Sequence, residues 1–141
     1  MLYSIPPMSP RFLLLFAALA AAPTAAQTAA PDSLPPGVTP AMVERGLRVF
    51  GGAGICMACH GPQGRGTLTG PDLTDSLWLH SDGAYDAIVA LIKTGVPAEQ
   101  SKTGKVMPPK GGSAITEADL RAVAAYVWSL RHSPSVRRRS E

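Results

Sequence analysis

The stretch Cys56-Met57-Ala58-Cys59-His60 decides how the rest of this sequence is interpreted. Two thiols separated by two residues, with an imidazole directly after them, form the pattern of covalent c-type haem attachment. A zinc site would need two further ligands, which His80 and His132 could supply in the absence of a third Cys. A thioredoxin-like redox pair would need a preceding strand, which residues 51–55 do not offer, and a plain disulfide stays open. We therefore expect a haem, with these three sites as alternatives.

Met107 is the best candidate for a second iron ligand. It lies in a polar stretch and is followed by Pro108-Pro109, which fixes the local backbone and removes two amide donors. A stiff loop of this kind can hold a soft thioether on the iron at a small entropic cost. Most methionines fill gaps in a core, as we expect for Met42, and Met57 lies between the two cysteines and cannot reach the opposite face. We expect Met107 and His60 to bind the iron together.

The overall composition excludes several classes of protein. The chain has 141 residues with 14 Gly, 14 Pro and two Cys, and aromatic residues make up only 6%. Two cysteines cannot form a multi-disulfide scaffold, and no apolar run reaches the roughly 18 residues that span a bilayer. The formal net charge of +3 is small. The composition therefore indicates one small soluble domain with a modest hydrophobic core, and neither a multi-span membrane protein nor a coiled coil.

Residues 1–26 are typical of a secretory signal peptide. Arg11 is the only charged residue in this stretch, and it precedes the apolar run Phe12–Ala22, which is too short to span a membrane. Small residues follow, so we expect cleavage after Ala26, with Ala22 as the alternative. An uncleaved membrane anchor is the weaker interpretation. The mature chain is then expected outside the cytoplasm, which in a bacterium means the periplasm.

Composition divides the rest of the chain into three segments. Residues 27–38 are small, polar and Pro-rich, and we expect a flexible leader there. Residues 39–132 carry the helix signals and the cysteine motif, so they form the expected domain. Residues 133–141, with three consecutive arginines, are expected to be a disordered basic tail. We expect no nucleic-acid binding, because the chain is exported and no basic–aromatic surface is apparent.

Three helices are predicted from apolar residues at helical spacing and from their end signals. They cover residues 41–50, 82–93 and 117–131. The first two are expected to start after the caps Thr39 and Ser81 and to end at glycines. The last is expected to start with a capping box formed by Thr116 and Asp119.

Two loops separate the expected helices. Residues 61–73 are rich in Gly, Pro and Thr and show no periodicity. Residues 96–113 form a second long irregular stretch, which is unusual inside a compact domain and indicates a function. No strand-like alternation of any length is present, so the fold class is expected to be all-α.

In their order, these features resemble the class I, mono-haem cytochromes c over residues 40–131. The matching elements are Gly46 and Phe50 before the cysteine motif, then Gly70-Pro71-Asp72-Leu73, Met107-Pro108-Pro109, and Tyr126 and Trp128 in the last helix. The resemblance implies a small all-α fold of three to four helices, with long loops wrapped around one covalently bound haem. It also implies that the first and last helices cross near Gly46, where the missing side chain allows a close approach.

The resemblance further implies a role for each site residue. Cys56 and Cys59 would hold the haem, and His60 and Met107 would be its axial ligands. The backbone carbonyl of Pro71 would accept the Nδ1–H of His60, which fixes the tautomer of the ring and strengthens it as a ligand.

Other residues near the expected site have competing interpretations. Trp78 could donate its indole N–H to a haem propionate, or it could pack in the core. His80 is the strongest alternative axial ligand, whereas His132 is expected to be a favourable cation at the end of the last helix. Lys105 and Lys110 are expected to be solvated.

Together, these residues predict electron transfer, and the chain is not expected to be an enzyme. With neutral His60 and the thioether of Met107 on the iron, we expect a raised reduction potential and no open site. The first interpretation is a monomeric periplasmic carrier between a dehydrogenase and a terminal oxidase or other acceptor. The second is a haem c subunit held permanently in a dehydrogenase or oxidase complex. The third and weakest is a haem enzyme or gas sensor with an open sixth site.

Overall fold

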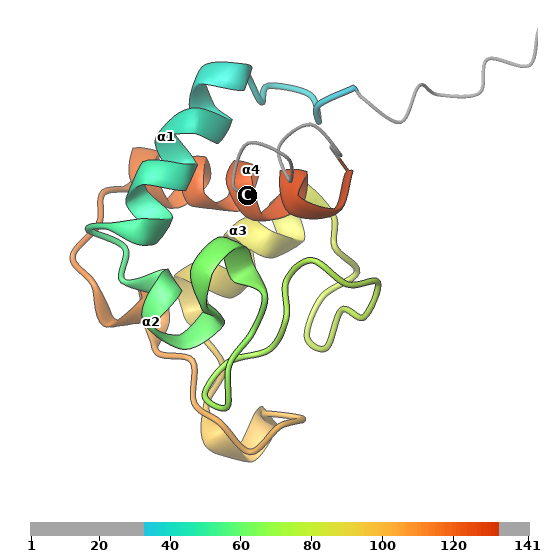
Figure 1. The fold of residues 1–141 in the computed structure, drawn as a ribbon, viewed down its shortest axis with the longest axis vertical. Coiled ribbons are helices and arrows are strands. Elements are labelled where there is room, and N and C mark those ends of the chain that lie inside the picture. The colour runs from blue at the N-terminus through green and yellow to red at the C-terminus, as the bar shows by residue number, and fades with distance from the viewer. Residues whose placement is uncertain (1–32, 133–141) are drawn as a thin grey trace, which may run out of the picture.

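The computed structural model describes residues 33–132. The predicted signal peptide, the first part of the expected leader and the expected basic tail therefore lie outside the described residues. Within residues 33–132 the structure has four α-helices and three short 3₁₀ turns, and its β pairing is limited to one isolated bridge (Figure 1). The prediction of an all-α fold with long loops is confirmed. None of the helices in this range combines the length and apolar character needed to cross a bilayer.

Helix α1 (Pro40–Gly51) begins as its sequence predicts. The side chain of Thr39 accepts a hydrogen bond from the backbone N–H of Met42 at 3.3 Å, and Pro40 occupies the first turn. These two residues satisfy the start of the helix without help from the rest of the fold. The preceding segment differs from the expected flexible leader, because Val38 is buried and Leu34 packs against the core.

Helix α4 (Glu117–His132) is capped by Thr116 as predicted, although Asp119 contacts the Thr116 hydroxyl and not its backbone N–H as in a full capping box. The backbone N–H of Asp119 donates to Oγ1 of Thr116 at 3.1 Å, and that hydroxyl in turn donates to the Asp119 carboxylate at 2.7 Å. Helix α4 crosses α1 at Gly46, where an added Cβ would overlap the backbone carbonyl of Ala122. The predicted crossing at Gly46 is therefore confirmed, since only a glycine leaves room for this approach.

Helix α3 (Tyr85–Thr94) begins later than predicted. The expected cap, Ser81, does not cap the helix: its Oγ accepts from the backbone N–H of Gly83 at 3.2 Å. Asp82 likewise accepts from the backbone N–H of Ala84 at 2.9 Å. Both side chains thus stabilise turns before the helix, which is a common alternative for Ser and Asp.

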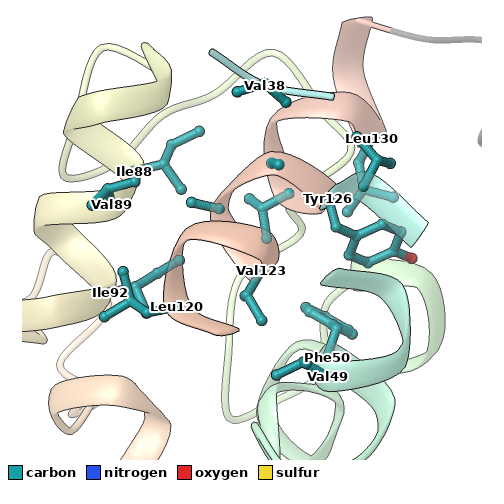
Figure 2. Close-up of a cluster of buried hydrophobic side chains, with 14 of the residues drawn as sticks. Val38, Val49, Phe50, Ile88, Val89, Ile92, Leu120, Val123, Tyr126 and Leu130 are labelled. Carbon is teal, nitrogen blue, oxygen red and sulfur yellow. The ribbon is translucent and has the colours of Figure 1, made fainter. Parts of the chain in front are cut away.

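The helices bury one hydrophobic core between α1, α3 and α4 (Figure 2). Phe50 of α1 and Tyr126 of α4 meet edge to face, with ring centroids 5.3 Å apart. Such a pair contributes about 0.5–1.5 kcal/mol beyond its area burial. On the other side of α4, Ile88, Val89 and Ile92 of α3 are buried in the same cluster.

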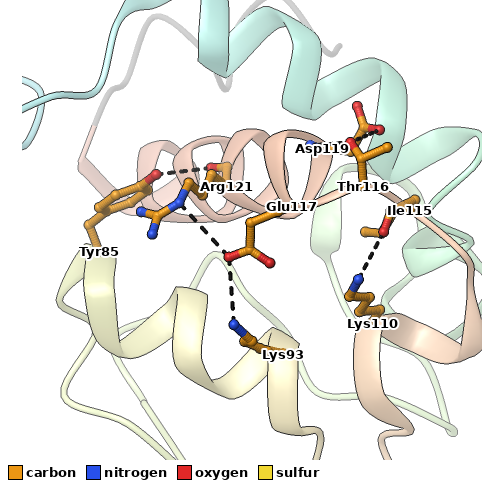
Figure 3. A network of polar contacts seen from close by, with 8 residues as sticks. All are labelled: Tyr85, Lys93, Lys110, Ile115, Thr116, Glu117, Asp119 and Arg121. Carbon is orange, nitrogen blue, oxygen red and sulfur yellow. Dashed lines mark hydrogen bonds and ion pairs between the residues drawn. The ribbon is translucent and has the colours of Figure 1, made fainter.

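Polar contacts at the surface join α3 to α4 (Figure 3). The hydroxyl of Tyr85 donates to the backbone carbonyl of Arg121 at 3.3 Å. Lys93 and Arg121 each lie 3.9 Å from the carboxylate of Glu117. These ion pairs are exposed, so each contributes little to stability, and the buried core holds the two helices together.

Three 3₁₀ turns and the short helix α2 (Cys56–His60) form the rest of the described structure. The turns are η1 (Pro62–Gly64), η2 (Ala98–Gln100) and η3 (Pro109–Gly112). The loop of residues 96–113 is therefore less irregular than expected. Val96 and Met107 exchange two backbone hydrogen bonds, of 2.7 and 2.9 Å, and these bonds close the residues between them into a hairpin-like loop.

Candidate haem-binding site

One cavity collects the residues that the sequence singled out. Cys56, Cys59, His60 and Pro71 line it from α2 and the following loop, and Met107 lines it from the distant loop. Its apolar walls come from α1, α3, α4 and the loops, and include Phe50, Ile88, Ile92, Val123 and Val127. A largely apolar cavity with two thiols, an imidazole and a thioether on its walls has the chemistry that a haem requires.

The two cysteines of α2 lie in different environments. Cys56 is partly buried and Cys59 is exposed. The pKa of the Cys56 thiol is raised to about 11, mainly because the thiol is buried; a backbone hydrogen bond lowers the pKa in part, and the proximity of Cys59 makes the smallest contribution, which raises it. This environment suits an uncharged thioether better than the thiolate that zinc would need. Within residues 33–132, no three His, Cys, Asp or Glu side chains lie close enough together to hold a metal ion.

Ile55, just before α2, has an unusual backbone conformation. Its φ of 58° places a β-branched residue in the left-handed region, which is rare outside turns and active sites. The chain adopts this conformation at the point where it turns from α1 into the cysteine motif. Such local strain costs about 1–3 kcal/mol and is commonly found at functional sites.

His60 is buried and oriented by one hydrogen bond. Its Nδ1 lies 3.0 Å from the backbone carbonyl of Pro71. Burial lowers the pKa of His60, although the hydrogen bond to Pro71 acts in the opposite direction. The neutral ring then donates its Nδ1–H to Pro71, and the lone pair of Nε2 is available as a ligand. This hydrogen bond is the one that the resemblance implied.

The loop after α2 is folded closely against the motif. The backbone N–H of Gly66 donates to the His60 carbonyl at 2.7 Å, and Thr67 Oγ1 donates to the Cys59 carbonyl at 2.5 Å. Gly70 lies against the same residue, and a Cβ on it would come within 2.7 Å of the Cys59 carbonyl oxygen. The glycines of this loop therefore allow the backbone to approach the motif and position Pro71.

Met107 is half-buried on the cavity wall. Its backbone is held by the bridge to Val96, and an added Cβ on Gly95 would overlap the Met107 carbonyl. Lys110, which was expected to be solvated, instead donates its Nζ to the backbone carbonyl of Ile115 at 3.0 Å. Lys105 is exposed and lines the cavity.

Of the three remaining residues with competing interpretations, two line the cavity and one does not. Trp78 lines the cavity, with the guanidinium of Arg131 lying over its ring, 5.4 Å from the centroid. His80 also lines the cavity, and its Nε2 accepts the backbone N–H of Lys102 at 3.4 Å. His132 lies elsewhere, stacked on Trp128 with centroids 4.0 Å apart. Sequence reasoning missed the contact between His80 and Lys102, because no local pattern relates these two loops.

Two solved structures are similar to this chain at low sequence identity. Cytochrome CL from the marine methylotrophic bacterium Methylophaga aminisulfidivorans is 21% identical with a TM-score of 0.49, covering 64% of this chain and 53% of that one. The c-type cytochrome XoxG from Methylobacterium extorquens AM1 is 22% identical with a TM-score of 0.48, covering 64% and 51%.

Curated relatives are more similar in sequence. The "Cbb3-type cytochrome c oxidase subunit CcoP" of Rubrivivax gelatinosus is 38% identical over 95 residues, which is 67% of this chain and 28% of the relative. The protein of the same description from Rhodobacter capsulatus is 36% identical over 98 residues, covering 64% and 30%. This chain therefore matches less than a third of the length of these relatives.

The family comparison agrees with the site. Residues 41–127 match the model of the family described as "Cytochrome C oxidase, cbb3-type, subunit III". This range includes every residue that lines the cavity, from Phe50 to Val127. The chain therefore belongs to this family of cytochromes c, whose covalent haem c is attached through the two cysteines found here as Cys56 and Cys59.

Proposed function

We propose that this chain transfers single electrons through one haem c, with His60 and Met107 as the axial ligands of its iron. The observation that carries the proposal is that these two side chains, one at the end of helix α2 and one in a loop far away in sequence, line one cavity beside both cysteines. The haem supplies the one-electron chemistry, and its potential depends on the axial ligands and their surroundings. The chain binds and orients the haem and excludes water from much of it.

The residues around the cavity determine whether the reduction potential of the haem is raised or lowered. The hydrogen bond to Pro71 orients the His60 ring, burial lowers its pKa and so favours the neutral form, and the thioether of Met107 is a soft, uncharged ligand. This pair favours the reduced iron, so the proposal includes a raised potential. Since His60 and Met107 would occupy both axial positions of the iron, we propose no catalytic step for this chain.

We further propose that the electron transfer takes place in a cbb3-type oxidase complex. The family match and the descriptions of the relatives support this second interpretation better than the free carrier. They give no support to a dehydrogenase as the partner. The predicted signal peptide supports a location on the periplasmic side, where such a complex would receive electrons.

Two exposed apolar side chains support a partner surface next to the cysteines. Leu68 is 95% exposed and Met57 is 42% exposed, and neither lines the haem cavity. Leu68 follows Thr67, whose hydroxyl is bonded to the Cys59 carbonyl, so it lies close to the attachment site. Exposed apolar groups of this kind are typical of interaction surfaces.

Affinity purification of the tagged protein from mild-detergent extracts of source membranes tests the complex. We expect oxidase subunits to co-elute in a fixed ratio, and we expect membranes lacking this chain to lose oxidase activity. A Leu68→Glu variant should weaken co-elution while keeping the haem spectrum, and Ala114→Glu, at another exposed position, is the matched control.

A protein that elutes alone, from cells whose oxidase activity survives its deletion, would overturn the oxidase assignment. If the same protein were reduced by a dehydrogenase and reoxidised by a separate acceptor, the free-carrier interpretation would replace it.

A further inference from the structure

The haem cavity has hydrogen-bond donors that the axial ligands do not explain. Trp78, His80 and Lys105 all line it. The lining contains one carboxylate, Asp72, and its Oδ1 already accepts from the backbone N–H and the hydroxyl of Thr74, at 2.6 and 2.7 Å. Several donors face a cavity in which the one carboxylate of the chain already accepts two hydrogen bonds from Thr74, and such a cavity suits an anionic group on the ligand. A haem carries two such groups, its propionates.

The hydrogen bonding of His80 identifies which of its nitrogens can donate. Its Nε2 accepts the backbone N–H of Lys102 at 3.4 Å. In the neutral ring the proton is therefore on Nδ1, because one imidazole nitrogen accepts while the other donates. Nδ1 makes no hydrogen bond to residues 33–132, although the half-buried ring lines the cavity. This arrangement also disfavours His80 as an axial ligand, since neither nitrogen offers a free lone pair.

Trp78 presents a second donor in the same cavity. Its ring is held on one side by the guanidinium of Arg131, 5.4 Å from the ring centroid. On another side lies Gly83, where an added Cβ would overlap the indole Nε1. The indole N–H has no acceptor among residues 33–132. Gly83 thus makes room for an indole whose N–H is left for the cavity.

We propose that His80 donates its Nδ1–H to a haem propionate, beside Trp78, whose indole N–H was already a candidate propionate donor in the sequence. Because Nε2 of the same ring accepts from Lys102, His80 joins the haem to the loop that ends at Met107. His80 is therefore a positioning residue for the Met107 side of the haem. The proposal requires a bound haem, but it does not depend on whether the chain works in an oxidase or as a free carrier.

Three variants of the holoprotein separate the two hydrogen bonds of His80. His80→Asn can place an amide N–H near the position of Nδ1 but is too short to accept from Lys102. His80→Gln can accept from Lys102 but has no donor near Nδ1. His80→Phe loses both interactions and keeps an aromatic ring.

The reduction potential and the infrared bands of the haem carboxylates report the first hydrogen bond. Removing a donor leaves the propionate charge less compensated, which stabilises the ferric iron. At one fixed pH we expect the Phe and Gln variants to have a lower potential and shifted carboxylate bands. The shift should reach a few-fold to about tenfold in the ferric-to-ferrous ratio, where tenfold equals about 59 mV for one electron. The Asn variant should stay near the native values.

Displacement of Met107 by added imidazole in the ferric protein reports the second hydrogen bond. We expect faster displacement in the Phe and Asn variants, whose loop has lost its link to residue 80, and a near-native rate in the Gln variant. Far-UV circular dichroism confirms that each variant is folded. Equal effects of all three substitutions, or unchanged potentials and carboxylate bands, would overturn the proposal. Loss of six-coordinate iron in the variants would also overturn the proposal, because it would indicate that His80 is an axial ligand.

Discussion

The two sides of the haem cavity are built differently. On the His60 side, short loops hold the ligand through many close contacts: His60 is buried, its ring is bonded to Pro71 at 3.0 Å, and its carbonyl accepts from Gly66 at 2.7 Å. On the Met107 side, a mostly exposed loop is closed by the two hydrogen bonds between Val96 and Met107. Because more contacts hold the His60 side, we expect the ligand on the Met107 side to be displaced more easily.

The largest effect is expected from His60→Ala. The substitution removes the proposed ligand and leaves the carbonyl of Pro71 without its partner, which alone costs about 1–3 kcal/mol if the group is buried. We expect most of the correctly assembled haem protein to be lost, as measured by the yield of holoprotein and its absorbance spectrum. His132→Ala is the control, because His132 stacks on Trp128 outside the cavity. A normal yield and spectrum from His60→Ala would contradict the assignment of His60.

A smaller effect is expected from Met107→Ala, because the covalent attachment and His60 remain. The weak far-red absorbance band that methionine gives to ferric cytochromes c should vanish, and carbon monoxide should bind the ferrous protein. The reduction potential should fall by at least about 59 mV, which corresponds to a tenfold change in the ferric-to-ferrous ratio. Met57→Ala is the matched control, since Met57 is exposed and lies outside the cavity lining. A retained far-red band in Met107→Ala would show that another residue is the ligand.

Gly70→Ala tests the tight packing of the His60 side. Its new Cβ would lie 2.7 Å from the Cys59 carbonyl oxygen, so the loop has to move. We expect a loss of about 1–3 kcal/mol in the free energy of unfolding, measured by denaturant titration of the holoprotein. Gly51→Ala is the control, because a Cβ there meets no atom within 4 Å. Equal stabilities of the two variants would mean that the His60 side is packed less tightly than described.

The smallest effect concerns the α1–α4 crossing, which supports both sides of the cavity. Hydrogen bonds from Thr116 and from Arg45, together with the Arg45 charge, lower the pKa of Asp119. Because the folded-state pKa is lower than the unfolded one, the stabilisation is present above the unfolded pKa. It is lost as pH falls through the acidic range toward the folded value. Asp119→Asn should flatten this part of the stability–pH curve, and an unchanged slope in acid would refute the contribution.

Local patterns predicted much of the fold and of the site. The helix starts at Thr39 and Thr116 follow from side chains that bond backbone N–H groups three residues away. The cysteine motif and the stiff segment after Met107 are equally local. The start of α3 was predicted wrongly because Ser81 and Asp82 form turns, and the same residue types serve turns and helix caps equally well.

Residue types at short spacing were enough to predict the covalent attachment chemistry and the all-α class, whereas the crossing at Gly46 was implied by the resemblance to cytochromes c. Only the tertiary structure decided that Val96 pairs with Met107, that Val38 joins the core, and that His80 meets Lys102 at the haem cavity. These contacts join segments that no periodic pattern relates. Their formation depends on how the helices pack around the cavity, and residue spacing does not predict that packing.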